Sequence, residues 1–275
     1  MNQIYMDKWQ GIPASLFRVL SMATAVFLSV SCYGPGGKIL PPPTVSPEAQ
    51  HRLSMLENHN RGLGTFKGMG SFRLENEEGL RNARVAWIGS DFRKLRIQVM
   101  DISGVPIMSI AADGDYFYAL SHRENRFYKT RASDPGLKKA IGIPMKTREA
   151  IQILTGRVPV RGHDSALVIR DEKNEGDVLV LTSRWGRVLE KIFFDKTGKT
   201  ALHMEMYDSM GNFVYRAEFG DIRIVENYML PFDLRVSAED VLFHLQIERY
   251  WADMPVSPAV FVLADPEKQD DDPEK

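Results

Sequence analysis

The sequence has a single cysteine among its 275 residues, and no long apolar run follows it. A single cysteine cannot form a disulfide within the chain, so burial of a core must stabilise the fold. A helix that spans a bilayer needs about 20 predominantly apolar residues, and no stretch beyond Cys32 meets that need. The formal net charge is only −1, which excludes a general electrostatic attraction to nucleic acid.

The amino terminus has the features of an export signal. Basic residues precede an apolar run at 19–30, and the small residues Ser29 and Ser31 stand just before Cys32. This order is typical of a secretory signal peptide. A cysteine at its exit predicts a bacterial lipoprotein, with residues 1–31 removed and Cys32 acylated. Two alternatives are an uncleaved anchor and a plain signal peptide with an incidental cysteine, which would yield a secreted binding protein.

A tether is predicted after the cysteine and a tail at the carboxyl end. Residues 32–45 are rich in Gly and Pro, and Pro41–Pro43 favours the extended polyproline II conformation. Residues 265–275 are acidic and poor in apolar side chains, which is typical of disorder. The body is therefore expected to be one domain, 46–264, held at a membrane by lipid on Cys32.

The body is expected to contain two clear helices. The segment Ser46-Pro47-Glu48 combines a helix cap, a proline suited to the first position and an acid in the first turn, and the helix should end before Gly62. A second helix should begin at Thr147 and end at Gly156, because glycine favours helix termination.

Most of the remaining sequence alternates apolar and polar residues with period two. The pattern is clear in segments 94–99, 202–207, 213–219 and 241–248. It is typical of antiparallel strands with one buried face. Roughly ten to twelve strands are expected, and a sheet of that size tends to curl or close. The predicted fold class is mainly β (α+β): a strongly curved antiparallel half-barrel with a helix covering its concave face.

Four segments follow one another behind Cys32: Phe66–Phe72, Ala83–Trp87, Leu95–Pro106 and Ile153–Pro159. In this order they resemble the LolA/LolB-like family of lipoprotein carriers and receptors. The resemblance implies a half-barrel that binds acyl chains in an apolar cavity without covalent chemistry. It further implies lipoprotein or lipid delivery to the outer membrane, with a periplasmic LolA-like carrier as a partner. In some bacteria, Asp directly after the acylated cysteine is linked to retention in the inner membrane. Tyr33 stands at that position here, which favours the outer membrane, with the body facing the periplasm.

The apolar cavity would be lined by inward-facing side chains of the strands. The candidates are Phe72, Trp87, Leu95, Ile97, Val99, Met204 and Met206. Methionine suits an adaptable wall because it repacks around different ligands. Burying one methylene is worth about 0.8 kcal/mol, so a palmitoyl chain represents about 12 kcal/mol gross. The alternative is a filled core, in which case the protein is an accessory envelope lipoprotein that acts as a docking module.

The loop Asp101–Pro106 is a second candidate site. Ile102 and Val105 flank a Ser-Gly turn, and a tight turn cannot readily bury both side chains. An exposed apolar residue in this loop aids membrane delivery in the receptors that the chain resembles, which implies a membrane-inserting role for Ile102 or Val105. The alternative is that both side chains tuck under the edge of the sheet.

The sequence offers little for catalysis or metal binding. His163-Asp164-Ser165 has the residue types of a catalytic triad, but neighbours in sequence rarely reach triad geometry, and the segment reads as a polar turn. The histidines lack paired ligand spacing, apart from His51 and His59, which are more typical of a solvent-facing helix. We therefore predict no enzyme, no metal site and no cofactor beyond the covalent lipid on Cys32.

Overall fold

The computed structural model describes residues 44–132, 134, 136–138, 142, 144–171 and 176–266. The expected signal peptide, Cys32, most of the tether and nearly all of the acidic tail lie outside these residues. In the part of the chain that is described, no helix has the length and apolar character needed to cross a membrane.

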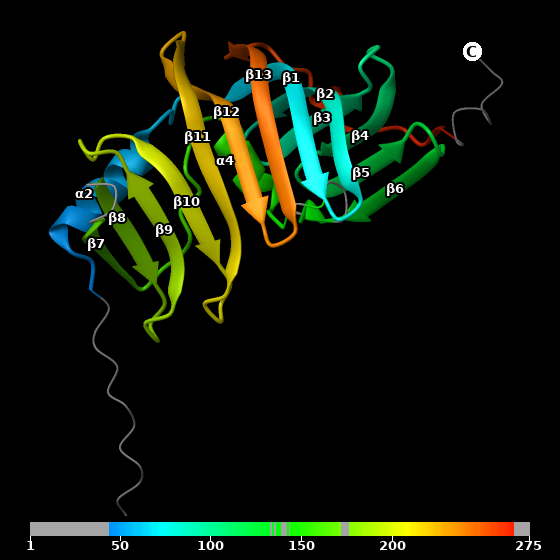
Figure 1. Ribbon diagram of the computed structural model, residues 1–275. Helices are drawn as coiled ribbons and strands as arrows, with labels where there is room; N and C mark the ends of the chain where they lie inside the picture. Colours follow the sequence, from blue (N-terminus) through cyan, green and yellow to red (C-terminus); the bar gives the residue numbers. More distant parts are fainter. Residues whose placement is uncertain are drawn as a thin grey trace, which may run out of the picture. The chain divides into compact units, whose positions relative to one another are not determined.

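The described residues form one antiparallel sheet of thirteen strands (Figure 1). The strands are β1 (Thr65–Asn76), β2 (Gly79–Ser90), β3 (Lys94–Met100), β4 (Pro106–Ala112), β5 (Tyr116–Ser121), β6 (Arg126–Arg131), β7 (Ser165–Asp171), β8 (Gly176–Thr182), β9 (Val188–Phe194), β10 (Ala201–Tyr207), β11 (Phe213–Val225), β12 (Tyr228–Ala238) and β13 (Val241–Ala252).

The strand order is β6-β5-β4-β3-β2-β1-β13-β12-β11-β10-β9-β8-β7. The first and last strands, β1 and β13, pair in the middle of the sheet. The sheet is open, because β6 and β7 form its two edges. The mainly β class is therefore confirmed, with more strands than the ten to twelve that the sequence predicted. The strong curvature of the predicted half-barrel stays a prediction.

Both predicted helices are confirmed. They are α2 (Pro47–Asn58) and α4 (Thr147–Leu154). The Ser46 hydroxyl accepts a hydrogen bond from the Ala49 backbone N–H at 3.1 Å, which caps α2. Gly156, just after α4, has a φ of +71°, a left-handed conformation that glycine adopts without steric cost.

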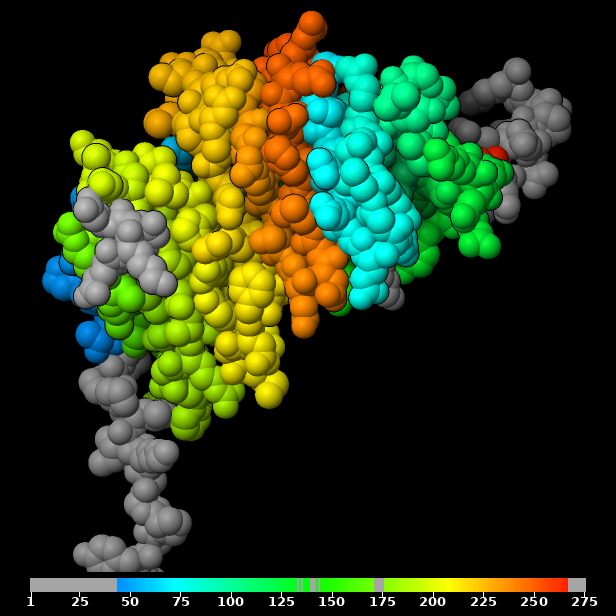
Figure 2. All heavy atoms as spheres, viewed as in Figure 1, coloured from blue at the N-terminus to red at the C-terminus, as the bar shows by residue number. Residues whose placement is uncertain are grey.

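The two helices pack on one face of the sheet, which we call the inner face. A single apolar cluster joins α2 and α4 to strands from β1 to β13. In Figure 1 helix α4 lies behind β11–β13, and the space-filling view from the same side (Figure 2) shows the strands themselves forming the opposite, outer surface. The arrangement explains the period-two pattern, since alternate side chains face either the helices or solvent.

A second, small cluster lies on the outer face of β4 and β5. Ala111 and Tyr118 pack there against Leu263, which follows the 3₁₀ helix η1 (Pro258–Phe261). The Arg96 guanidinium on β3 donates a hydrogen bond to the Val260 carbonyl at 3.0 Å. The carboxyl-terminal segment thus covers part of a face that the sequence pattern predicted to be wet.

Candidate functional site

Most of the predicted cavity residues belong to the apolar inner-face cluster or pack against it. Four of them belong to the main inner-face cluster, namely Trp87, Leu95, Met204 and Met206. Phe72 and Ile97 pack at the edge of that cluster, and Val99 is also buried. Met204 and Met206 have no exposed surface at all. Met204 and Met206 on β10 are separated from the residues on β1, β2 and β3 by the intervening strands β11, β12 and β13, and the role of the set as walls of an acyl cavity stays a prediction.

The loop between β3 and β4 exposes both of its apolar side chains. Ile102 is 85% exposed and Val105 is 58% exposed, so neither tucks under the sheet edge. The Asp101 carboxylate holds the loop by accepting hydrogen bonds from the backbone N–H groups of Ser103 and Val105, at 2.9 and 3.0 Å. These bonds, and above all one from the Ser103 hydroxyl, lower the pKa of Asp101. Membrane insertion by this loop stays a prediction.

A buried polar cluster, which we call the inner polar cluster, joins α4 to the sheet. Its members are Glu149 on α4, Arg161 on the connection to β7, Glu190 on β9 and Tyr215 on β11. The Tyr215 hydroxyl donates to the Glu149 carboxylate at 3.1 Å, and the Arg161 guanidinium lies 3.7 Å from the same carboxylate. The Arg161 backbone N–H donates to the Glu190 carboxylate at 2.9 Å. Charged groups this deep in an apolar core cost free energy unless they are paired.

Glu190 is the most unusual residue of this cluster. It has no exposed surface, and one of its carboxylate oxygens has no hydrogen-bond partner among the described residues. Burial raises the pKa of Glu190 to about 8, although the bond from Arg161 opposes this shift. Glu190 is therefore largely protonated at neutral pH. Burial, reinforced by Glu149, likewise raises the pKa of Tyr215 far above its ordinary value.

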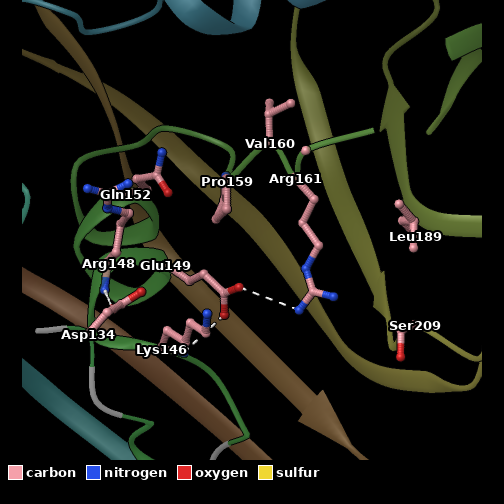
Figure 3. A pocket seen from close by; sticks show the side chains of 11 residues that line it. Asp134, Lys146, Arg148, Glu149, Gln152, Pro159, Val160, Arg161, Leu189 and Ser209 are labelled. Carbon is pink, nitrogen blue, oxygen red and sulfur yellow. Dashed lines mark hydrogen bonds and ion pairs between the residues drawn. The ribbon is translucent and has the colours of Figure 1, made fainter. Parts of the chain in front are cut away.

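A polar pocket of about 460 Å³ opens beside this cluster (Figure 3). The residues that line it come from the 134–152 region, the 159–162 connection and the β9 and β10 ends: Asp134, Lys146, Arg148, Glu149, Gln152, Pro159, Val160, Arg161, Gly162, Leu189 and Ser209. The Lys146 backbone N–H donates to Glu149 at 3.0 Å, and the Arg148 backbone N–H donates to Asp134 at 3.1 Å. With both signs of charge at its wall, the pocket suits a polar or zwitterionic group.

The sequence interpretation missed the inner polar cluster. Glu149 is an acid in the first turn of α4, a position at which a carboxylate stabilises the helix dipole without any contact to the sheet. Glu190 offered a usable signal, because it alternates in register with Ile192 and Phe194, two buried residues of β9. A carboxylate at such an inward position is expected to be buried, and buried carboxylates deserve consideration as site residues.

The triad-like residues do not meet one another. The His163 ring bonds with the Arg161 carbonyl at 2.8 Å, Asp164 accepts from the Arg184 backbone N–H at 2.7 Å, and Ser165 accepts from the Thr44 backbone N–H at 3.1 Å. Each side chain thus stabilises a different stretch of backbone, as expected for a polar turn.

No group of three or more histidine, cysteine or acidic side chains within the described residues is placed to hold a metal ion.

An open antiparallel sheet with helices packed on one face is the LolA-like fold. It is shared with a LolA superfamily protein from Nitrosomonas europaea, at a TM-score of 0.55 and 10% identity over 78% of this chain and 97% of that one. A domain from Vibrio parahaemolyticus, described as an outer membrane lipoprotein-sorting protein, matches with a TM-score of 0.51 and 13% identity over 78% and 94% of the two chains.

A DUF1329 family protein from Desulfovibrio piger shares the fold as well, with a TM-score of 0.56 and 10% identity over 81% of this chain and 98% of that one. Identities this low establish the fold alone. No protein-family model matches the sequence, and no curated protein matches it either.

Proposed function

We propose that this protein is an outer-membrane lipoprotein, anchored through Cys32, that binds acyl chains and assists delivery of lipoproteins or lipids. Binding is non-covalent, the body faces the periplasm, and a LolA-like carrier is the partner that hands over cargo. The observation that carries the proposal is the packing of α4 on the apolar inner face of an open LolA-like sheet. Two of the proteins that share the fold are named for LolA or for lipoprotein sorting.

The acyl chain would lie between α4 and the inner face, in the curve of a half-barrel. The inner face offers the seven predicted cavity residues, among which Met204 and Met206 can repack around a chain of variable length. Because these side chains fill the space in the absence of cargo, α4 must move away from the sheet when an acyl chain enters. The gain of about 0.8 kcal/mol for each buried methylene is the driving force.

The inner polar cluster sits where such a movement would begin. Glu149 on α4 contacts Tyr215 on the sheet and Arg161 on the connection that follows α4. Separating α4 from the sheet breaks these contacts and exposes their polar groups to the neighbouring pocket. We propose that the polar end of the cargo occupies this pocket while its acyl chain lies beneath α4.

Native mass spectrometry with an acylated lipoprotein peptide tests this proposal. The protein is the chain from residue 32 onward with Cys32→Ala, so that it carries no lipid of its own. We expect a complex with the acylated peptide and none with its unacylated twin. Met204→Ala removes side-chain contacts with the chain and should weaken binding by roughly ten-fold, which corresponds to about 1.4 kcal/mol.

Met210→Ala is the matched control, since Met210 is exposed on a turn and should leave the affinity unchanged. Circular dichroism checks that both variants fold. Equal binding of the acylated and unacylated peptides, or equal affinities of Met204→Ala and Met210→Ala, would contradict an acyl site on the inner face.

A filled core favours a second candidate function. Met204, Met206 and Tyr215 are fully buried, and the two pockets of about 460 and 350 Å³ have polar walls. The protein would then be an accessory envelope lipoprotein that serves as a docking module. Absence of binding to either peptide in the same experiment would favour this function.

A further inference from the structure

Two neighbouring hairpin turns expose large apolar side chains at one end of the sheet. Trp185, in the β8–β9 turn, is 70% exposed, and Met210, in the β10–β11 turn, is 71% exposed. The two hairpins are adjacent because β9 pairs with β10. A hydrogen bond of 3.2 Å from the Arg187 guanidinium to the Ser209 carbonyl links the turns directly. We call these two turns the apolar tips.

The described chain begins at the same end of the sheet. The Thr44 backbone N–H donates to the Ser165 hydroxyl at 3.1 Å, and the Ala166 backbone N–H donates to the Thr44 carbonyl at 3.0 Å. Ser165 starts β7 and pairs with Thr182, which immediately precedes the β8–β9 turn. In Figure 1 both tips project toward the lower left, where the described chain also starts. The tether therefore joins the body beside the apolar tips.

The tether is short enough to keep this end near its anchor. About twelve residues separate Cys32 from Thr44, and they span at most about 40 Å when fully extended. Thr44, which lies at the same end of the sheet as the tips, is therefore within about 40 Å of a bilayer that holds a lipid on Cys32.

The chemistry of the tips suits the headgroup region of a bilayer. Tryptophan prefers this region because it combines an apolar ring with a polar N–H. Arg184 and Arg187 flank Trp185 and are exposed, which places guanidinium groups where lipid phosphates lie. Each tip presents its exposed apolar side chain on a hairpin turn.

We propose that the apolar tips are the membrane-facing surface of this protein, with Trp185 and Met210 inserted among phospholipid headgroups. The inference rests on the proposed lipid anchor at Cys32, but it does not depend on acyl-chain cargo. In this arrangement, the end of the sheet at which the tether joins the body faces the membrane that holds the lipid on Cys32.

The β3–β4 loop with Ile102 lies elsewhere on the sheet. Four strands, β2, β1, β13 and β12, separate that loop from the β10–β11 hairpin. At about 4.8 Å per strand the separation along the sheet is about 24 Å, and the usual twist of 20–25° per strand turns the strand direction by roughly 100° over this distance. The tips and the β3–β4 loop therefore point in different directions and make separate contacts.

Quenching of tryptophan fluorescence by brominated phospholipid tests the inference. The intact lipidated protein is reconstituted into vesicles of phosphatidylethanolamine and phosphatidylglycerol, with bromine near the headgroup end of the acyl chains. We expect quenching in the wild type and loss of most of it in Trp185→Phe. Trp251→Phe should retain it, because Trp251 is exposed near the end of β13, at the opposite end of the sheet.

Two further variants distinguish membrane contact by the apolar tips from membrane contact by the β3–β4 loop. Met210→Glu should weaken quenching of Trp185, whereas Ile102→Ser should leave it unchanged. Quenching that survives in Trp185→Phe, or that disappears in Ile102→Ser, overturns the inference. Flotation of the protein with the vesicles is measured first. A chain that does not float lacks the lipid anchor and refutes the inference together with that part of the proposed function, whereas flotation without quenching refutes the inference alone.

Discussion

At the scale of single residues, Glu190 is a carboxylic acid with no exposed surface. Its carboxyl group lies on the inner face between β8 and β10, with Leu181 and Met206 as its partners in the strand pairing. Burial holds its pKa near 8, so the folded protein keeps a proton there that the unfolded chain releases at lower pH. Stability and pH are therefore coupled at this position.

We predict that Glu190 destabilises the protein as the pH rises from about 5 to 8. Below the ordinary carboxyl pKa, both states carry the proton and nothing is lost. Above it the unfolded chain loses its proton while the folded chain keeps it, so the free energy of unfolding falls until the pH reaches the folded pKa of about 8. The fall amounts to a few kcal/mol, at about 1.4 kcal/mol for each unit of pKa difference.

Urea unfolding at pH 5 and pH 8 measures this effect. Glu190→Gln cannot ionise and should lose less stability between the two pH values than the wild type. Glu218→Gln is the matched control, because Glu218 is partly exposed on β11 and should keep the wild-type difference. Identical pH dependence in Glu190→Gln and the wild type would show that Glu190 is not held protonated.

At the scale of elements, two glycines allow aromatic rings to lie across neighbouring strands. A Cβ on Gly68 in β1 would overlap the Trp87 ring on β2, and a Cβ on Gly89 in β2 would overlap the Phe66 ring on β1. These pairs lie directly opposite each other in the register. The glycines therefore provide space for two buried rings beneath the helices.

Gly68→Ala is predicted to destabilise the protein by about 1–3 kcal/mol, because the added methyl group forces the buried Trp87 ring to move. Gly64→Ala is the control, since a Cβ there meets nothing within 4 Å and should change stability by less than about 0.5 kcal/mol. Urea unfolding followed by tryptophan fluorescence measures both. Similar midpoints for the two variants would mean that the sheet accommodates the methyl group without cost.

The register of the β9–β10 pairing explains where the period-two alternation of apolar and polar residues fails. The period-two pattern of 202–207 predicts that Leu202 faces inward with Met204, yet Leu202 is exposed. The β9–β10 pairing shifts between Ala201 and His203, so the extra residue breaks the alternation. Sequence periodicity cannot reveal such a shift, because the shift depends on which residue of β9 lies opposite each residue of β10.

At the scale of the whole molecule, the proposed anchor rests on Cys32. Because this is the only cysteine, the denatured protein has no free thiol if Cys32 is acylated. We predict that protein purified from membranes does not react with maleimide under denaturing conditions, and that its mass includes the lipid. Cys32→Ala should move the protein to the soluble periplasmic fraction.

A reactive thiol in the membrane-purified protein would contradict acylation, and so would membrane retention of Cys32→Ala. Either result would also remove the lipid anchor from the proposed function, while the fold of the body would be unaffected.

The sequence alone determined the mainly β class, both helices and the inward placement of most apolar strand residues. These features follow from local rules: caps and glycines define helix ends, and alternation defines which face of a strand is buried. The sequence also placed two apolar residues, Ile102 and Val105, in the β3–β4 turn. The structure then established that both are exposed.

Only the tertiary structure decided what depends on contacts between distant segments. The strand order that pairs β1 with β13 is one example. The inner polar cluster is another, since it joins Glu149 to Tyr215 across 66 positions of sequence. The apolar tips became neighbours of the tether through the pairing of Thr44 with Ala166. Periodicity states which side chains turn inward, but it does not state which partners they meet there.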